Sequence, residues 1–216
     1  MHSSELIPIE YGVYSDSEAA AVAALLGEVF SRRDPPAVAV GLTASEFEDF
    51  VRLLCPTLEA EGLTIVARHA GTKDVVGVLL TQDSSSASPD GVGRLSPKFD
   101  PIFDILGQLD AEYRAGRAVP PGECLHLFLL GVSDRVAGRG VGQQLVAACL
   151  ELGAKKGYGL AVTEATNKVS QHIFRKQGFE ERVRRSYRSH RFGGRAVFAS
   201  IADQGGPALM ERRINP

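Results

Sequence analysis

The sequence predicts a mixed α/β fold in which strands and helices alternate along one domain, residues 1–216. Residues 125–132 form a continuous apolar run with the length of a strand buried on both faces. A glycine-rich turn follows, and residues 141–152 then show the apolar spacing of a helix. With 216 residues, 44% of them hydrophobic, the chain is long enough for one domain with a sizeable core.

The N-terminal part is predicted to open with a strand and a helix. Residues 7–14 alternate between apolar and polar side chains enough to form the strand. Ser15 and Glu18 then have the spacing of a capping box, and the helix that follows is expected to end near Phe30.

A loop is predicted at residues 31–42, because two consecutive prolines follow Asp34 and disfavour a regular helix. Thr43 begins another capping-box pattern, which predicts a second helix with Pro56 as its stop.

The middle of the chain is predicted to hold a hairpin, a loop and a helix. Residues 63–68 and 75–81 read as two antiparallel strands, and the second is apolar enough to be central in a sheet. Residues 84–96 form a polar loop rich in Ser, Pro and Gly, and residues 102–113 have helical spacing.

The C-terminal part is predicted to complete the sheet. A short strand is expected at residues 160–165 and a helix at residues 170–177. Further β structure is expected at residues 179–187 and 197–201, and residues 209–214 are predicted to be a last strand.

Composition excludes several classes of function. A net charge of −2 gives no general footprint for nucleic acid, and the arginine-rich stretch 182–195 is interpreted as a solvated strand face. Cys55, Cys124 and Cys149 lack the spacing of metal ligands and are expected to be reduced and structural, so no metal is predicted. No signal sequence and no apolar run of 18 residues is present, which predicts a cytoplasmic protein without a membrane partner.

The glycine-rich turn has the properties of a phosphate site. Its alternate glycines leave backbone N–H groups accessible at the start of a helix, where the unpaired donors and the helix dipole favour an anion. A dinucleotide site would need the spacing G-x-G-x-x-G and an acidic residue about 20 positions later; Glu164 lies at a tolerable distance, but the glycine spacing does not fit. A turn without a ligand is the other alternative. The residues concerned are Ala137, Gly138, Arg139, Gly140, Val141 and Gly142.

Two segments, VSDRVAGRGVGQQL and ATNKVSQHIFRKQGFEE, resemble the Gcn5-related N-acetyltransferase (GNAT) superfamily. Four further segments make the chain similar to the insect-type arylalkylamine (dopamine) N-acetyltransferases: FSRRDPPAVAVGL, KFDPIFDILGQL, SYRSHRFGGRAVF and ALMERRI. In the superfamily's Q/R-x-x-G-x-G/A loop motif, the Q/R position is Ala137 here, so the backbone must hold the phosphate without that side chain.

The resemblance implies a fold and a cofactor. The fold has a mixed, mostly antiparallel sheet of about six or seven strands with helices on both faces. Acetyl-CoA enters between two splayed parallel strands, here residues 125–132 and 160–165. Its pantetheine arm is then expected to bond to the main chain near Leu130 and Val132, and Asn167 is expected to contact the same arm.

Two candidates arise for the base that deprotonates the amine. The resemblance places Asp34 where insect-type relatives carry a functional acidic residue before proline, although an Asp that stabilises a turn is an equal alternative. His126 lies on the core strand at a position that resembles a histidine of vertebrate relatives, and its ordinary pKa suits a base. A histidine satisfied within the core is the alternative there.

Many superfamily members protonate the leaving thiolate with a tyrosine, but Phe174 stands at that position here. By resemblance to the insect-type enzymes, the hydroxyls of Thr166 and Ser170 take this role. Ser170 is also a candidate N-cap for the helix that follows.

These observations predict an acetyl-CoA-dependent N-acetyltransferase that acetylates a small primary amine by direct transfer in a ternary complex. An arylalkylamine or a polyamine is the expected acceptor. Alternatives are an amino acid, an aminoglycoside-like drug or a protein N-terminus as acceptor, and a non-catalytic acyl-CoA sensor. The missing tyrosine favours the sensor, and the candidate base and hydroxyls favour the enzyme.

Overall fold

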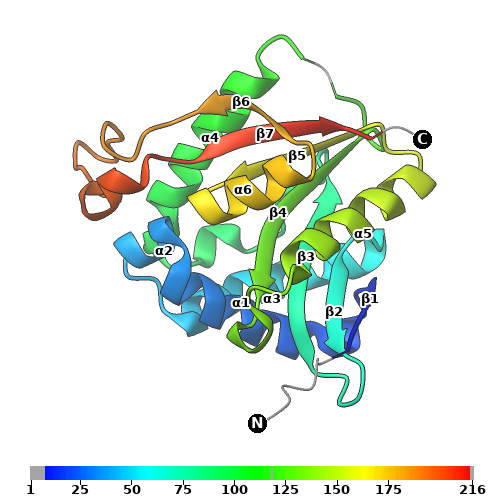
Figure 1. Ribbon diagram of the computed structural model, residues 1–216. Helices are drawn as coiled ribbons and strands as arrows, with labels where there is room; N and C mark the ends of the chain where they lie inside the picture. Colours follow the sequence, from blue (N-terminus) through cyan, green and yellow to red (C-terminus); the bar gives the residue numbers. More distant parts are fainter. Residues whose placement is uncertain (1–7, 118, 215–216) are drawn as a thin grey trace.

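A twisted sheet of seven strands, in the order β1-β2-β3-β4-β5-β7-β6, forms the centre of the protein (Figure 1). The computed structural model describes residues 8–117 and 119–214. The strands are β1 (Ile9–Val13), β2 (Ile65–His69), β3 (Val75–Asp83), β4 (Cys124–Val132), β5 (Leu160–Ala165), β6 (Glu180–Arg184) and β7 (Ala208–Arg213). Every neighbouring pair is antiparallel except β4 and β5, which confirms the predicted mixed, mostly antiparallel sheet.

Helices cover both faces of this sheet. One apolar cluster joins the sheet to α1, α3 and α4, and a second joins its other face to α5 and α6, which lie in front of the sheet in Figure 1. The α-helices are α1 (Ala19–Arg33), α2 (Pro35–Ala39), α3 (Ala44–Glu61), α4 (Asp100–Arg114), α5 (Val141–Lys155) and α6 (Lys168–Lys176). Short 3-10 helices are η1 (Asp16–Glu18), η2 (Val92–Arg94), η3 (Pro97–Phe99), η4 (Asp134–Val136) and η5 (Ala199–Gln204).

The parallel strands β4 and β5 separate after three residue pairs. They are paired from Cys124 with Leu160 to His126 with Val162, and no pairing is found beyond that point. Both strands continue, β4 as far as Val132 and β5 as far as Ala165. The sheet therefore opens between them, as the family resemblance implied.

The predicted loop at residues 31–42 is wrong in two respects. Helix α1 extends beyond Phe30 to Arg33, and a further short helix, α2, begins at Pro35. Proline is compatible with the first helical turn because the N–H groups there have no helical partner. Asp34 ends α1 and caps α2, so its backbone is fixed from both sides.

Pro56 does not end the second predicted helix. Helix α3 runs on to Glu61, and Gly62, with φ of 58°, is the residue that stops it. The capping box of Thr43 and Glu46 is present as predicted. Pro56 removes one N–H from the helix, but both Pro56 and Arg52, the residue one turn earlier, are exposed, so the carbonyl that loses its helical partner lies on an exposed face of the helix.

The prediction of a strand at residues 197–201 is also wrong. Gly193 and Gly194, both with positive φ, turn the chain between Phe192 and Arg195, and the following residues form η5 instead. Phe198 and Ile201 are buried in the cluster shared with α1 and α3. Helix η5 packs beside α2, so this C-terminal segment supports the position of Asp34.

The remaining predictions concern the hairpin, the cysteines and the surface. The hairpin is confirmed, with β3 inside the sheet, while Ile7 of the predicted opening strand lies outside the described residues. All three cysteines are free and buried, as expected. Only the start of the arginine-rich stretch is a strand, β6, and its arginines pair with Glu181 and Glu211. Within the described parts of the chain, none of the helices is long and apolar enough to cross a membrane.

Candidate active site

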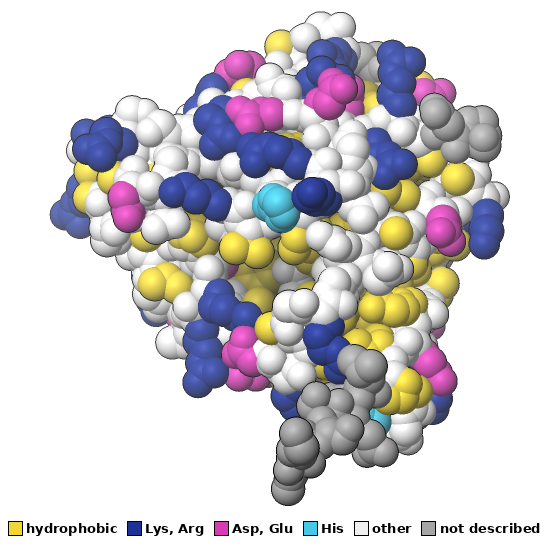
Figure 2. Space-filling view, viewed as in Figure 1, with side chains coloured by type: hydrophobic (Ala, Val, Ile, Leu, Met, Phe, Trp, Pro, Cys, Tyr) yellow, Lys and Arg dark blue, Asp and Glu magenta, His cyan; other side chains and the backbone are white. Residues whose placement is uncertain are grey.

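A cavity of about 660 Å³ occupies the opening between β4 and β5 and continues along α1, α3 and α4. Figure 2 shows a hollow with hydrophobic side chains at its base on the face that carries α5 and α6. The predicted residues Asp34, His126, Leu130, Val132, Thr166, Asn167 and Ser170 all line this cavity. The structure thus brings together residues from three separate parts of the sequence.

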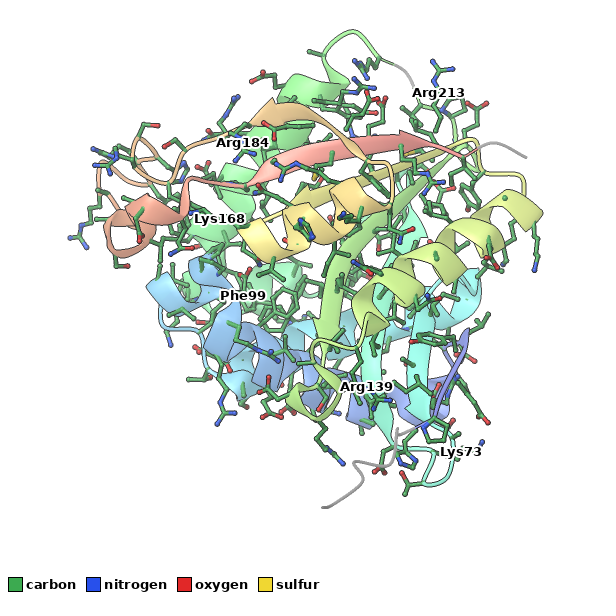
Figure 3. All side chains as sticks on the ribbon, in the orientation of Figure 1. Lys73, Phe99, Arg139, Lys168, Arg184 and Arg213 are labelled. Atoms are coloured by element: carbon green, nitrogen blue, oxygen red, sulfur yellow. The ribbon has the colours of Figure 1, made fainter. Side chains whose placement is uncertain are left out.

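One part of the cavity wall is aromatic, and we call it the aromatic end. Rings from α1, α3, η3 and α4 pack against one another there in stacked, tilted and edge-on pairs, with centroids 4.6 Å to 5.9 Å apart. One of them, Phe99, is labelled near the centre of Figure 3. The aromatic end consists of Phe30, Phe47, Phe50, Phe99 and Phe103.

The open edge of β4 leaves the main-chain groups of Leu130 and the N–H of Val132 available. The Ser133 N–H donates to Val76 on β3, so Val132 faces the opposite edge, and Leu130, two residues earlier, faces the same way. A bulge at Phe128 shifts the register of β4 against β3 next to this edge. Bulges that adjoin a cavity commonly redirect side chains and backbone groups toward it.

Arg33 reaches this edge from the end of α1. Its guanidinium donates to the Val132 carbonyl at 3.0 Å and pairs with Asp134 at 2.7 Å. The sequence analysis did not single out Arg33, although it lies beside Asp34. In the structure it connects α1 to the edge where the pantetheine arm is expected.

The glycine-rich loop leads directly into α5, as predicted. Gly138 and Gly140 have φ of 74° and 76°, a left-handed conformation that glycine adopts without strain, and Gly140 is the N-cap of α5. A Cβ on Gly142 would lie 3.2 Å from Ile173, so glycine there allows α5 and α6 to approach. Arg139, labelled in Figure 3, lies on this loop. The loop lies outside the cavity lining, on the side of the sheet that carries α5.

Asp34 is buried, with 7% of its surface exposed; it lines the cavity, and its N–H donates to the carbonyl of Phe30 at 3.1 Å. Its carboxylate accepts hydrogen bonds from the Thr166 hydroxyl at 2.5 Å and the Ala37 N–H at 3.3 Å. Burial raises the pKa of Asp34 to about 6, although both hydrogen bonds act to lower it. The Asp34 side chain thus caps α2 and also lines the cavity.

Thr166 and Asn167 follow directly after β5. The Thr166 carbonyl accepts a hydrogen bond from the buried Tyr187 hydroxyl at 2.7 Å, which fixes the backbone at this point. Asn167, rather than Ser170, is the N-cap of α6, because its side chain accepts from the Ser170 N–H at 2.9 Å. Ser170 occupies the third helical position, and its hydroxyl donates to the Asn167 carbonyl at 3.0 Å.

His126 is not alone on its strand. Its Nε2 lies 2.6 Å from an Oε2 atom of Glu164 on β5, at the point where the two strands separate. Burial opposes the charged imidazolium, but the Glu164 carboxylate outweighs it and raises the pKa of His126 above its ordinary value. Burial likewise opposes the Glu164 carboxylate, yet the pairing with His126 holds the pKa of Glu164 below its ordinary value.

Glu164 was considered in the sequence only as a ribose ligand, and its pairing with His126 was missed. The parallel pairing of His126 with Val162 places Glu164 on the same face, two residues along β5. A sequence argument that combined the alternation of both strands with their parallel register would have found the pair.

Residues 41–179 match the acetyltransferase (GNAT) family, which is more than half of the chain. The chain belongs to the GNAT family. Membership makes it an acetyltransferase by class and confirms the resemblance found in the sequence.

Three solved structures resemble this GNAT chain over nearly its whole length. The C-terminal condensation domain of Ebony, in complex with beta-alanyl-dopamine, has a TM-score of 0.88 and 14% identity, covering 97% of this chain and 100% of that one. Arylalkylamine N-acetyltransferase 2 from Aedes aegypti has a TM-score of 0.79 and 22% identity, covering 96% and 99%. The polyamine N-acetyltransferase of Drosophila melanogaster has a TM-score of 0.76 and 17% identity, covering 95% and 100%. At these identities the likeness establishes the shared fold.

Proposed function

We propose that the protein is an acetyl-CoA-dependent N-acetyltransferase that acetylates the primary amine of a small molecule by direct transfer in a ternary complex. The observation that carries this proposal is the Asp34–Thr166 hydrogen bond, which places a buried carboxylate in the cavity beside the opening of the sheet. The family membership supplies the class of reaction, and the cavity supplies the arguments for the acceptor.

Asp34 is the proposed general base. An alkylamine is almost wholly protonated at neutral pH, so it needs a proton acceptor before it can attack an acyl carbon. The pKa of Asp34 is about 6, so the carboxylate is mostly ionised at pH 7 and is more basic than an ordinary aspartate. The proton therefore passes from the amine nitrogen to a carboxylate oxygen of Asp34, directly or through one water.

His126 is a weaker choice for this role. Its Nε2 is bonded to Glu164, and the raised pKa of His126 favours the protonated imidazolium, which has no free lone pair. We infer that the His126–Glu164 pair holds β4 and β5 together at the point where the two strands separate.

The residues of the chain fit acetyl-CoA. The first turn of α5 and its glycine loop offer backbone donors for the pyrophosphate. The main-chain groups of Leu130 and the N–H of Val132 offer partners for the pantetheine amides. Asn167, at the N-cap of α6, lines the same opening. When bound, acetyl-CoA supplies the acetyl group as a thioester whose sulfur leaves as a thiolate and needs a proton.

Thr166 and Ser170 are the proposed source of that proton, since Phe174 offers no hydroxyl. The Thr166 hydroxyl is hydrogen-bonded to Asp34. When this hydroxyl gives its proton to the thiolate, the proton that Asp34 took from the amine can pass to the Thr166 oxygen. Ser170 lines the same cavity, one helical turn further on.

The aromatic end favours an acceptor with an apolar or aromatic body. Five phenylalanine rings line the same cavity as Asp34, which is the arrangement expected for an arylalkylamine. Two similar structures agree with an amine of this kind, one an arylalkylamine N-acetyltransferase and one a domain bound to beta-alanyl-dopamine.

The direct test is the release of CoA thiol from acetyl-CoA in the presence of a panel of arylalkylamines, polyamines, amino acids and aminoglycosides. We expect release that depends on an arylalkylamine and yields the N-acetyl product by mass spectrometry. Binding of acetyl-CoA without turnover of any amine would favour the non-catalytic sensor instead.

A further inference from the structure

We propose that Arg33, at the end of α1, binds a phosphate of the cofactor and replaces the side chain that the glycine-rich loop lacks at Ala137. The motif has Gln or Arg at that position, whereas Ala137 offers neither a charge nor a side-chain hydrogen bond. This inference rests on the proposed function, because it concerns the acetyl-CoA of that reaction. Binding measurements test it without turnover.

Arg33 lies where β4 ends and the loop begins. Its guanidinium donates to the carbonyl of Val132, the last residue of β4, at 3.0 Å and pairs with Asp134 at 2.7 Å. The Ala137 N–H donates to the Asp134 carbonyl at 3.3 Å. One residue, Asp134, therefore contacts both the Arg33 guanidinium and the position where the motif's side chain is missing.

The arginines of the loop itself make contacts on the other side of β4. Arg135 pairs at 3.6 Å with Asp74, in the turn between β2 and β3. Arg139 lies near Tyr11 on β1, where burial raises the pKa of Tyr11 and the charge of Arg139 opposes that rise. In the order of the sheet, β1, β2 and β3 all lie on the side of β4 away from β5. Arg33, in contrast, lines the opening between β4 and β5.

The other cationic side chains of the cavity lie toward its opposite end. Among the described residues that line it, these are Arg114 and His126. His126 lies where β4 and β5 are still paired, and Arg114 donates to the Ser84 carbonyl beside the start of β4. Val132 is six residues beyond His126, which is roughly 20 Å along a strand. Of these cations, Arg33 alone adjoins the loop.

The present contacts of Arg33 leave it able to bind an anion. A guanidinium has five N–H donors in a planar fork that suits phosphate oxygens, and the contacts with Val132 and Asp134 use two of them. The side chains of Arg33 and Asp134 are 43% and 69% exposed, so water screens their ion pair and little is lost when a phosphate shares the guanidinium. The backbone donors of the loop then hold the pyrophosphate while Arg33 neutralises part of its charge.

The test measures Kd by isothermal titration calorimetry for acetyl-CoA and for S-acetylpantetheine, which has the same thioester and arm but no phosphate. Arg33→Met keeps the length of the side chain and removes its charge. We expect it to weaken acetyl-CoA binding about tenfold, the value of one charge-assisted hydrogen bond, and to change the Kd of S-acetylpantetheine by less than about twofold. The tenfold difference should shrink as NaCl is raised from about 0.05 M to about 0.5 M.

Arg32→Met is the matched control. Arg32 is the neighbouring arginine of α1, but its guanidinium pairs with Glu28 one turn earlier at 2.9 Å, and it does not line the cavity. The control should leave the Kd of both ligands within about twofold of wild type, because it removes the same charge from the same helix end.

Restoring the motif tests the replacement itself. Ala137 is exposed, so an arginine side chain can be placed there without disturbing the core. Ala137→Arg should recover most of the acetyl-CoA affinity lost in Arg33→Met, yet add less than about threefold to the wild-type affinity, because one phosphate site is then served twice. Equal gains in the two backgrounds would show that the two positions act independently and would overturn the replacement.

Three other results would contradict the role of Arg33 and leave the proposed function intact. They are an unchanged acetyl-CoA Kd in Arg33→Met, an equal loss for both ligands, and tighter binding of acetyl-CoA, which would mean that Arg33 obstructs the edge at Val132. Wild type that binds acetyl-CoA but acetylates no amine would leave the role of Arg33 standing and remove the proposed reaction. Wild type that does not bind acetyl-CoA would remove both.

Discussion

Thr166 donates a hydrogen bond to Asp34 at 2.5 Å across 132 residues of sequence. The bond joins the end of β5 to the junction of α1 and α2, the two sides of the cavity that must stay together for acyl transfer. The Tyr187 hydroxyl donates a hydrogen bond to the Thr166 carbonyl, and η5 packs beside α2. The proposed base is therefore fixed by the C-terminal segment as well as by its own helices.

Asp34 should lower the stability of the fold at neutral pH. Its pKa is about 6 in the folded protein against 3.8 without burial, so the folded state binds more protons between these values, and stability falls as the pH rises from about 4 to 6. Asn also caps helices well. Asp34→Asn should therefore unfold at a higher urea concentration than wild type at pH 7. Its free energy of unfolding should be greater by up to about 3 kcal/mol, at 1.36 kcal/mol per pKa unit, and the difference should vanish near pH 4. A difference that does not depend on pH would contradict the buried charge.

The His126–Glu164 pair should behave as one unit in stability. His126→Gln leaves a buried carboxylate without its partner and should cost about 3 kcal/mol in the free energy of unfolding. Adding Glu164→Gln should recover most of that loss, because a neutral amide pair replaces the ion pair. Urea denaturation of the two single variants and the double variant measures the coupling. Losses that simply add would mean that the two side chains do not depend on each other.

Substitutions of Ser170 can separate its role in the capping box of α6 from its proposed role as a proton donor. Ser170→Ala removes one half of the capping box with Asn167 and should lower kcat at least tenfold, with a loss of about 1 kcal/mol in stability. Ser170→Gln restores a residue suited to this third helical position but no hydroxyl. We expect the glutamine variant to regain stability and to stay slow. Full activity in the alanine variant would leave Ser170 with a structural role only.

The glycine loop is tested through binding rather than catalysis. Gly140 has positive φ, which Asn and Asp tolerate better than other side chains, so Gly140→Asp and Gly140→Asn carry similar strain. Acetyl-CoA should raise the Tm of wild type by mass action on the folded state. The rise should disappear in Gly140→Asp, where a negative charge faces the pyrophosphate, and survive in part in Gly140→Asn. Equal rises in both variants would place the phosphate elsewhere.

Local sequence signals predicted most of the helices and strands. Capping boxes at Ser15 and Thr43, the apolar run of β4 and the glycine loop before α5 each act within a few residues, so their structure follows from local chemistry. The errors at Pro35 and Pro56 have one cause. Proline was taken as a helix breaker, but a helix accepts it in the first turn, and packing against the core holds α3 through Pro56.

The contacts of the site were harder to predict than its members. Asp34, His126, Thr166 and Ser170 were predicted as candidates and line one cavity, yet their hydrogen-bond partners depend on the folded sheet. The Asp34–Thr166 bond needs the position of β5 relative to α2, and the His126 bond to Glu164 needs the parallel register of β4 and β5. Arg114 is another case, since its guanidinium reaches the Ser84 carbonyl only when α4 packs along the sheet.

The assignment of Asp34 as the base is tested most directly by kcat/KM measured against pH for wild type and Asp34→Asn with the same arylalkylamine. Wild type should gain activity as the pH rises through about 6, where Asp34 loses its proton. Asp34→Asn should lack this step and fall by about 10²- to 10⁴-fold at pH 7, with a deficit that shrinks at high pH as free amine becomes available. An asparagine variant that keeps wild-type kcat/KM and the step near pH 6 would contradict the assignment.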